Sequence, residues 1–192
     1  MRGMAWRADT AVHALPKCTP VNLDDDDFTL FGLPPRFALD RSELDARWRA
    51  LQAEEHPDRF AAQGAAAQRV AMQWAVRVNE AYRRLKEPLA RAAYLCELRG
   101  VPVQAENNTA MPAAFLMQQM EWREALDEAA DATAAQSLDD TVAAQERALF
   151  ARVEESLDRQ DDATAAAQHV RALMFVDRFR QAIDQRLESL GA

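Results

Sequence analysis

The chain has 192 residues, a formal net charge of −8, 49% hydrophobic residues and only five glycines. No apolar run approaches the roughly 20 residues that cross a bilayer, and the first residues lack the apolar stretch of a secretory signal, which disfavours membrane and secreted classes. Cys18 and Cys96 are far apart and form no CxxC pattern, so neither a disulfide framework nor a zinc site is supported. Abundant Ala, Leu, Gln, Glu and Arg predict an all-α protein, which we place in the cytoplasm.

The charge is unevenly spread along the chain. Residues 27–98 carry 11 basic and 10 acidic side chains, a balance of +1, whereas residues 99–192 carry 9 basic and 17 acidic ones, a balance of −8. This asymmetry indicates two surfaces with different partners, and it argues against nucleic acid as the main one.

The chain opens with residues 1–26, which show no hydrophobic periodicity and are predicted to form a flexible leader. The acidic run Asp24–Asp27 at its end can stabilise the N-terminus of the next helix, expected over 28–33, through the helix dipole. A proline-containing loop follows. Asp40 or Ser42 can then cap a second helix.

Two amphipathic helices come next, separated by a proline. The first has apolar residues at helical spacing at Leu44, Trp48 and Leu51. The second and longer stripe comprises Val70, Trp74, Val78, Tyr82 and Leu85. Pro57 lacks a backbone N–H and ends the first helix, so we predict a helical hairpin whose exposed tip is His56-Pro57-Asp58.

The second half of the chain predicts a bundle. Pro88 opens a short helix, and Gly100 breaks the chain soon after it. Three further helices are expected near 112–131, 139–159 and 163–190. Short polar connections make them an antiparallel bundle. The predicted domains are a leader at 1–26, a first domain at 27–98, a linker at 99–111 and a second domain at 112–190.

The helix near 112–131 has two distinguishable faces. At about 100° per residue, its apolar core residues group on one side: Phe115, Trp122, Leu126 and Ala129. Nearly opposite lie two methionines among carboxylates: Met117, Met120, Glu121, Glu124 and Glu128. From these residues alone, methionines that fill gaps in the bundle are the favoured interpretation. An adaptable binding patch of flexible, polarizable side chains is the alternative.

Several motifs resemble a known family. The order and spacing of four segments are similar to the J-domain of DnaJ-type co-chaperones: Phe28–Leu33, Trp48-Arg49, His56-Pro57-Asp58 and Val78–Leu85. Two later segments resemble the HscB family, the J-proteins of iron–sulfur cluster biogenesis: Arg91–Leu95 and Ala114–Glu124. The resemblance runs from Asp27 to the C-terminus. It implies an L-shaped, all-α protein with an N-terminal J-domain hairpin and a C-terminal antiparallel three-helix bundle.

By this resemblance, the hairpin tip binds a DnaK-class chaperone, the specialised HscA, and accelerates its ATP hydrolysis. The residues concerned are His56, Pro57, Asp58, Arg47, Arg49 and Arg59. A carboxylate at the tip can accept a charge-assisted hydrogen bond from an arginine, and the flanking arginines can steer docking. J-domains usually place a basic residue and an aromatic just before the tip. This chain has Glu54 and Glu55 there, which weakens the positive face.

The resemblance also implies a binding face for the cluster scaffold IscU, and it reverses the preference for gap-filling methionines. Carried over residue by residue, this face comprises Leu116, Met117, Met120, Glu121, Glu124, Glu128 and Phe175. No residue resembles a cluster ligand. We therefore expect no cofactor and no metal on this chain, with the iron and sulfur held by the partner.

Three other interpretations were weighed against this one. A general J-protein serving DnaK and unfolded clients is the nearest alternative, but the chain lacks a glycine-rich segment and cysteine-rich zinc repeats. An enzyme using His56 and Asp58 as an acid–base pair is disfavoured, because no nucleophile or metal site is linked to the tip. A purely structural helical scaffold would affect no ATPase.

Overall fold

The computed structural model describes residues 24–54, 64–103 and 112–191. Within these ranges the regular elements are helices: α1 (Asp27–Leu30), α2 (Arg41–Glu54), α3 (Ala65–Lys86), α4 (Pro88–Leu98), α5 (Ala113–Glu128), α6 (Ala132–Glu154), the π-helical turn η2 (Glu155–Arg159) and α7 (Ala163–Ser189). Most of the predicted leader, the hairpin tip and most of the predicted linker lie outside the described residues.

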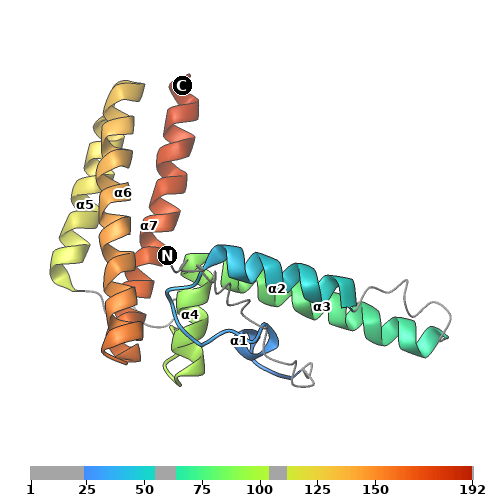
Figure 1. Cartoon of the computed structure of the whole chain (residues 1–192). Coiled ribbons are helices and arrows are strands. Elements are labelled where there is room, and N and C mark those ends of the chain that lie inside the picture. Colours follow the sequence, from blue (N-terminus) through green and yellow to red (C-terminus); the bar gives the residue numbers. More distant parts are fainter. Residues whose placement is uncertain (1–23, 55–63, 104–111, 192) are drawn as a thin grey trace, which may run out of the picture.

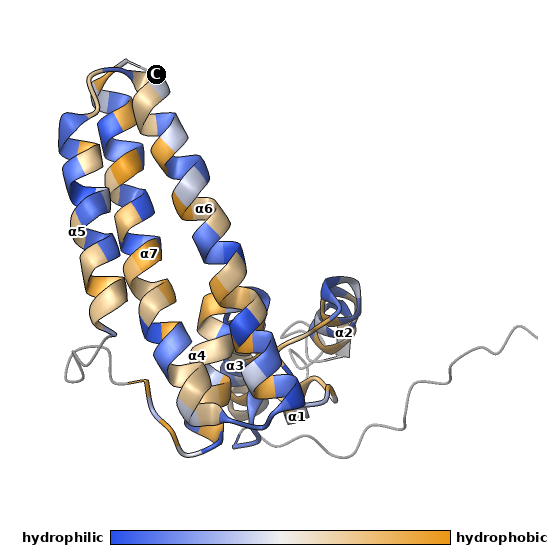
Figure 2. Cartoon of the chain, turned by 90° about the vertical axis from the view of Figure 1, so that its left-hand side faces the viewer, coloured by the Kyte–Doolittle hydropathy of each residue, from blue (hydrophilic) through white to orange (hydrophobic). Residues whose placement is uncertain are grey.

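The helices form two arms that meet in an L (Figure 1). The hairpin of α2 and α3 makes one arm and α5, α6 and α7 make the other, with α4 at the corner against α7. Figure 2 shows the second arm from the side, with apolar and polar positions mixed along each of its helices. The prediction of an all-α, L-shaped fold is confirmed.

Aspartates account for the starts of the first two helices. The Asp26 carboxylate accepts the backbone N–H groups of Phe28 and Thr29 at 2.9 and 3.0 Å. The Asp40 carboxylate accepts the N–H of Ser42 at 2.8 Å and its hydroxyl at 2.7 Å. These bonds satisfy donors that have no partner within the helix. Asp40, and not Ser42, is therefore the cap of α2.

The first arm has a core between α2 and α3. Leu44 of α2 and Val78 of α3 are buried, and the Trp48 and Tyr82 rings stack with centroids 4.7 Å apart. The predicted stripe of α3 is wrong at Val70, which is 51% exposed. The reason is length: α3 has 22 residues and α2 has 14, and the first turns of α3 extend past the end of α2 (Figure 1).

The last carboxylate of the acidic run has a different role from the one expected. Asp27 is fully buried and pairs with Arg77 at 2.7 Å and with Arg84 at 3.1 Å. Its backbone N–H donates to the Tyr94 hydroxyl at 3.0 Å. Buried charges are tolerated where they are paired in this way. Asp27 thereby ties α1 to both α3 and α4.

In the second arm, α6 packs along α7. Four residues at helical spacing are buried along α6 and η2: Val142, Leu149 and Val153 of α6 and Leu157 of η2. They meet the buried face of α7, which includes Val176, Phe179 and Ile183.

The start of α6 was predicted at 139, and the structure places it at Ala132. The Asp131 carboxylate accepts the backbone N–H of Ala134 at 2.8 Å and so caps a helix that begins with small residues. The prediction was late because the first turns of α6 carry little apolar periodicity. Pro112 also differs slightly: it stands just before α5 and not in its first turn.

The π-helical turn η2 joins the two arms. It aims Asp158 at the first arm, where the carboxylate accepts the backbone N–H groups of Phe37 and Ala38 at 2.8 and 2.7 Å. The Phe37 ring also stacks with Phe150 of α6, with centroids 6.1 Å apart. The segment between α1 and α2 is thus held on the second arm by both a charge and a ring.

Arg91 of α4 also contacts the segment between α1 and α2 at this corner. It is 8% exposed and donates to the carbonyl oxygens of Phe37, at 3.0 Å, and Leu85. Its guanidinium carbon lies 5.1 Å from the centre of the Phe37 ring. Burial lowers the pKa of Arg91, and the nearby Asp158 carboxylate opposes this shift. The guanidinium therefore supports the same segment that Asp158 holds.

The beginning of the predicted linker also packs on the second arm. Arg99 donates to the Leu157 carbonyl oxygen at 2.6 Å and pairs with Asp161 at 3.1 Å. Val103 is buried, and its carbonyl oxygen accepts a bond from Arg171 at 3.2 Å. The chain is therefore fixed to the bundle for several residues beyond α4.

We predict that Asp158→Asn loosens the corner. The asparagine amide is uncharged and has only one acceptor oxygen, so it cannot accept the N–H groups of both Phe37 and Ala38. The free energy of unfolding should therefore fall by about 2 kcal/mol. Small-angle scattering should show a larger radius of gyration. Asp140→Asn, an exposed carboxylate on α6, is the matched control and should change neither. Identical melting and scattering curves for both variants would contradict a role for Asp158 in joining the arms.

Candidate partner-binding surfaces

The hairpin tip lies outside the described residues, and with it His56, Pro57, Asp58 and Arg59. The structure does describe the helices on either side of it. The Trp48 indole and the Gln52 amide both donate to the Asn79 side-chain oxygen, at 3.1 and 2.8 Å. These bonds cross from α2 to α3, so the two helices that lead into the tip are fixed side by side.

The two described arginines predicted to flank the tip differ in their surroundings. Arg47 donates to the carbonyl oxygens of Phe31 and Gly32 at 2.8 Å and pairs with Glu43 at 2.6 Å. Arg49 is exposed. Gly32 has φ +61°, and a side chain there would meet the Arg47 guanidinium at 2.8 Å. Arg47 is therefore engaged in holding the turn after α1, whereas Arg49 is open to a partner.

The apolar residues of α5 that were predicted to bind the scaffold protein are exposed to solvent. Leu116 is 44% exposed, Met117 is 64% exposed and Met120 is 71% exposed. The carboxylates predicted with them are also exposed: Glu121, Glu124 and Glu128. We call these six residues the α5 face. On the opposite side of α5, Trp122 is buried and stacks on Phe179 of α7, with ring centroids 5.7 Å apart. The methionines are thus not gap fillers of the bundle.

Phe175, the seventh residue predicted for this face, lies between two helices. Its ring meets Phe115 edge-on at 5.8 Å between centroids and stacks with Phe179 at 6.0 Å. The Arg123 guanidinium lies over it at 5.9 Å. The side chain is partly buried and joins α5 to α7. Its environment differs from that of the two exposed methionines.

Known proteins share this architecture. The family model for the HSCB C-terminal oligomerisation domain matches residues 111–184. The chain is 53% identical over 173 residues to the co-chaperone protein HscB homolog of Burkholderia multivorans. The aligned region covers 88% of this chain and 98% of that protein. The chain belongs to the HscB family of co-chaperones.

Solved HscB structures agree with this assignment. Chaperone HscB from Vibrio cholerae has a TM-score of 0.80 at 38% identity, covering 86% of this chain and 99% of that one. Human co-chaperone HscB has a TM-score of 0.79 at 25% identity, covering 97% and 94%. For this HscB-family chain, the first arm is the J-domain and the second is the C-terminal helical bundle. No helix in the described ranges is long and apolar enough to cross a membrane.

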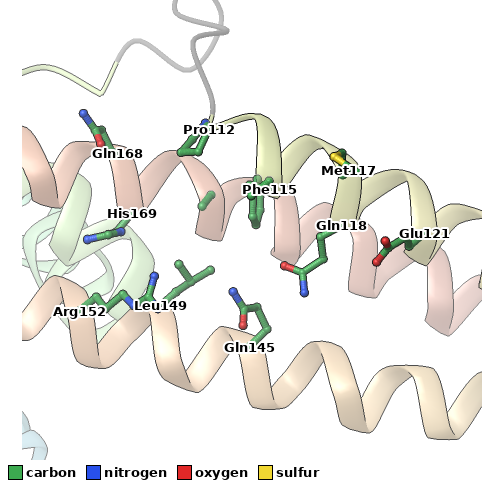
Figure 3. Close-up of a pocket in the computed structure, with 12 residues that line it drawn as sticks. Pro112, Phe115, Met117, Gln118, Glu121, Gln145, Leu149, Arg152, Gln168 and His169 are labelled. Carbon is green, nitrogen blue, oxygen red and sulfur yellow. The ribbon is translucent and has the colours of Figure 1, made fainter.

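A cavity in the HscB-type bundle was not anticipated from the sequence. It has a volume of about 560 Å³ and lies between α5, α6 and α7 (Figure 3). Gln118, Gln145, Arg152 and His169 supply polar groups around it. Burial lowers the pKa of His169, and Arg152 lowers it further. These residues lie on three different helices, and no local pattern in the sequence connects them.

The thiol and metal chemistry of the described residues is limited. Cys96 is buried, and burial raises its pKa to about 11, so the thiol stays protonated near neutral pH. Cys18 lies outside the described residues. Among the described residues, no group of three or more His, Cys, Asp or Glu side chains is arranged to hold a metal ion.

A pair of alanine substitutions should separate core from surface in this bundle. Phe175→Ala removes the edge-on contact with Phe115 of α5 and the stack with Phe179 of α7, and it should lower the free energy of unfolding by about 2 kcal/mol. Met120→Ala removes an exposed side chain and should change it by less than about 0.5 kcal/mol. Urea unfolding of both variants measures the difference. Equal destabilisation would mean that Met120 packs in the core.

Proposed function

We propose that the chain is a co-chaperone that stimulates the ATPase of a DnaK-class chaperone of the HscA type and delivers the iron–sulfur scaffold IscU to it. The α5 face carries this proposal. Adjacent exposed apolar side chains on a soluble surface mark interaction sites. Methionine adapts its shape to a partner, and the surrounding carboxylates keep the face hydrated when no partner is bound.

The chaperone side of the proposal rests on the hairpin. The fixed α2–α3 pair leads into His56, Pro57 and Asp58, and the exposed Arg49 can steer a charged partner. Asp58 would accept a hydrogen bond from an arginine of the chaperone. Hydrolysis chemistry then belongs to the chaperone. This assignment is supported by relatives that are named co-chaperones, and we place the activity in the cytoplasm.

Delivery follows from joining the two sites in one body. The corner formed by Asp158 and Arg91 holds the J-domain and the bundle together. A scaffold bound to α5 and a chaperone bound to the hairpin are then held near each other at a raised effective concentration. The chain would therefore stimulate the ATPase more strongly when the scaffold is present.

His56→Gln tests the chaperone site. The thermal unfolding curve should stay the same, because a hairpin-tip side chain contributes little packing, whereas stimulation of the HscA ATPase should be lost. The measurement is steady-state ATP hydrolysis with and without IscU, repeated with DnaK as the chaperone. Full stimulation by a folded His56→Gln variant would reject the site. Equal action on DnaK, unaffected by IscU, would favour a general J-protein.

Replacing Met117 and Met120 together with alanine tests the scaffold site. Burying a methionine side chain contributes about 1.5–3 kcal/mol, so affinity for IscU should fall by about two orders of magnitude or more. Stimulation by the chain alone should persist, and the extra stimulation with IscU should vanish. Met72→Ala is the matched control, since Met72 is 60% exposed on α3, away from α5. Calorimetric titration that shows unchanged IscU binding would reject the α5 face.

A further inference from the structure

The cavity between α5, α6 and α7 is continuous with the α5 face. Met117 and Glu121 belong to that face and also line the cavity. Its volume of about 560 Å³ falls in the usual range for binding pockets, roughly 300–1,000 Å³. A partner that covers the α5 face therefore reaches the mouth of the cavity as well.

The middle of the cavity combines apolar walls with two amides. Phe115, Leu149 and Ala172 supply apolar surface. Gln118 of α5 and Gln145 of α6 point toward each other from opposite sides (Figure 3). Within the described part of the chain, neither side-chain amide forms a hydrogen bond. A primary amide has two donor hydrogens and an acceptor oxygen, so this pair is suited to the peptide groups of an extended segment.

The two ends of the cavity differ in charge. Arg152 and His169 lie at one end, and Glu121 lies toward the other (Figure 3). Arg152 is exposed and makes no ion pair with any residue that the structure describes. A cationic end is unusual in a bundle whose residues 99–192 carry a balance of −8. This difference in charge between the two ends of the cavity favours a ligand segment whose negative charge lies at the Arg152 end.

We infer that this cavity is a second subsite for the scaffold protein, and that it receives an extended segment carrying an apolar side chain beside a carboxylate side chain. The inference rests on the proposed function. The carboxylate meets Arg152, the apolar side chain lies against Phe115 and Leu149, and the backbone meets Gln118 and Gln145. The carboxylates of the α5 face select basic groups elsewhere on the same partner. Opposite charge preferences at the two subsites set the orientation of the scaffold.

Charge reversal at Arg152 tests the subsite. Arg152→Glu should weaken IscU binding at least tenfold in a calorimetric titration, and Arg152→Ala should weaken it less. Arg147→Glu makes the same change in net charge at an exposed position of α6 that does not line the cavity, and it should stay within twofold of the unmodified chain. Gln145→Trp, which fills the space between the two amides, should also weaken binding tenfold. One Asp→Arg or Glu→Arg change in IscU should restore affinity to Arg152→Glu.

The outcomes separate this inference from the function on which it rests. Normal IscU affinity in folded Arg152→Glu and Gln145→Trp variants, with affinity lost in the Met117 and Met120 double variant, overturns the subsite alone. Equal weakening by Arg152→Glu and Arg147→Glu also overturns it, because net charge then explains the effect. No IscU binding by the unmodified chain overturns the proposed function instead. Melting curves confirm folding, and Arg152→Ala, at an exposed position, keeps the test valid if the tryptophan variant is unstable.

Discussion

The carboxylate of Asp158 accepts two backbone N–H groups of the first arm, at Phe37 and Ala38, and together with the packing of α4 on α7 this contact joins the two arms of the L. It is available because the chain leaves α6 through a π-helical turn, a rare geometry that is often found at functional positions. Arg91 holds the same segment from α4. The segment before α2, the turn η2 and helix α4 thus meet at one corner. These contacts set the orientation of one arm relative to the other.

The second arm presents the α5 face, whose exposed apolar side chains would be unfavourable without a partner. α5 buries Trp122 against α7 and leaves Met117 and Met120 in water. An amphipathic helix normally exposes a polar face, so a second apolar face needs a partner. α5 packs against α6 and α7 on the side of the bundle away from the α2–α3 hairpin (Figure 1), so the α5 face is left open to a partner.

The distribution of charge on the bundle can set the orientation of a partner bound to this surface. Acidic side chains dominate residues 99–192, and several surround the exposed methionines. Arg152 interrupts that pattern at one end of the cavity. A uniformly acidic surface would attract any basic partner. A surface with one cationic end discriminates between orientations of the same partner, which is where charge contributes most to recognition.

Local periodicity in the sequence determined the order of the helices and set Met117 and Met120 opposite the core residues of α5, because facing along a helix follows from spacing alone. The residues alone nevertheless favoured methionines that fill gaps in the bundle, and the structure decided that both side chains are exposed. The tip motif and the family were also legible in the sequence. Only the tertiary structure decided that Val70 is exposed, that Phe175 joins α5 to α7, and that Asp158 binds the Phe37 backbone from 121 positions away. Each of these depends on which element lies opposite, and a helical repeat carries no information about a neighbour that is distant in the chain.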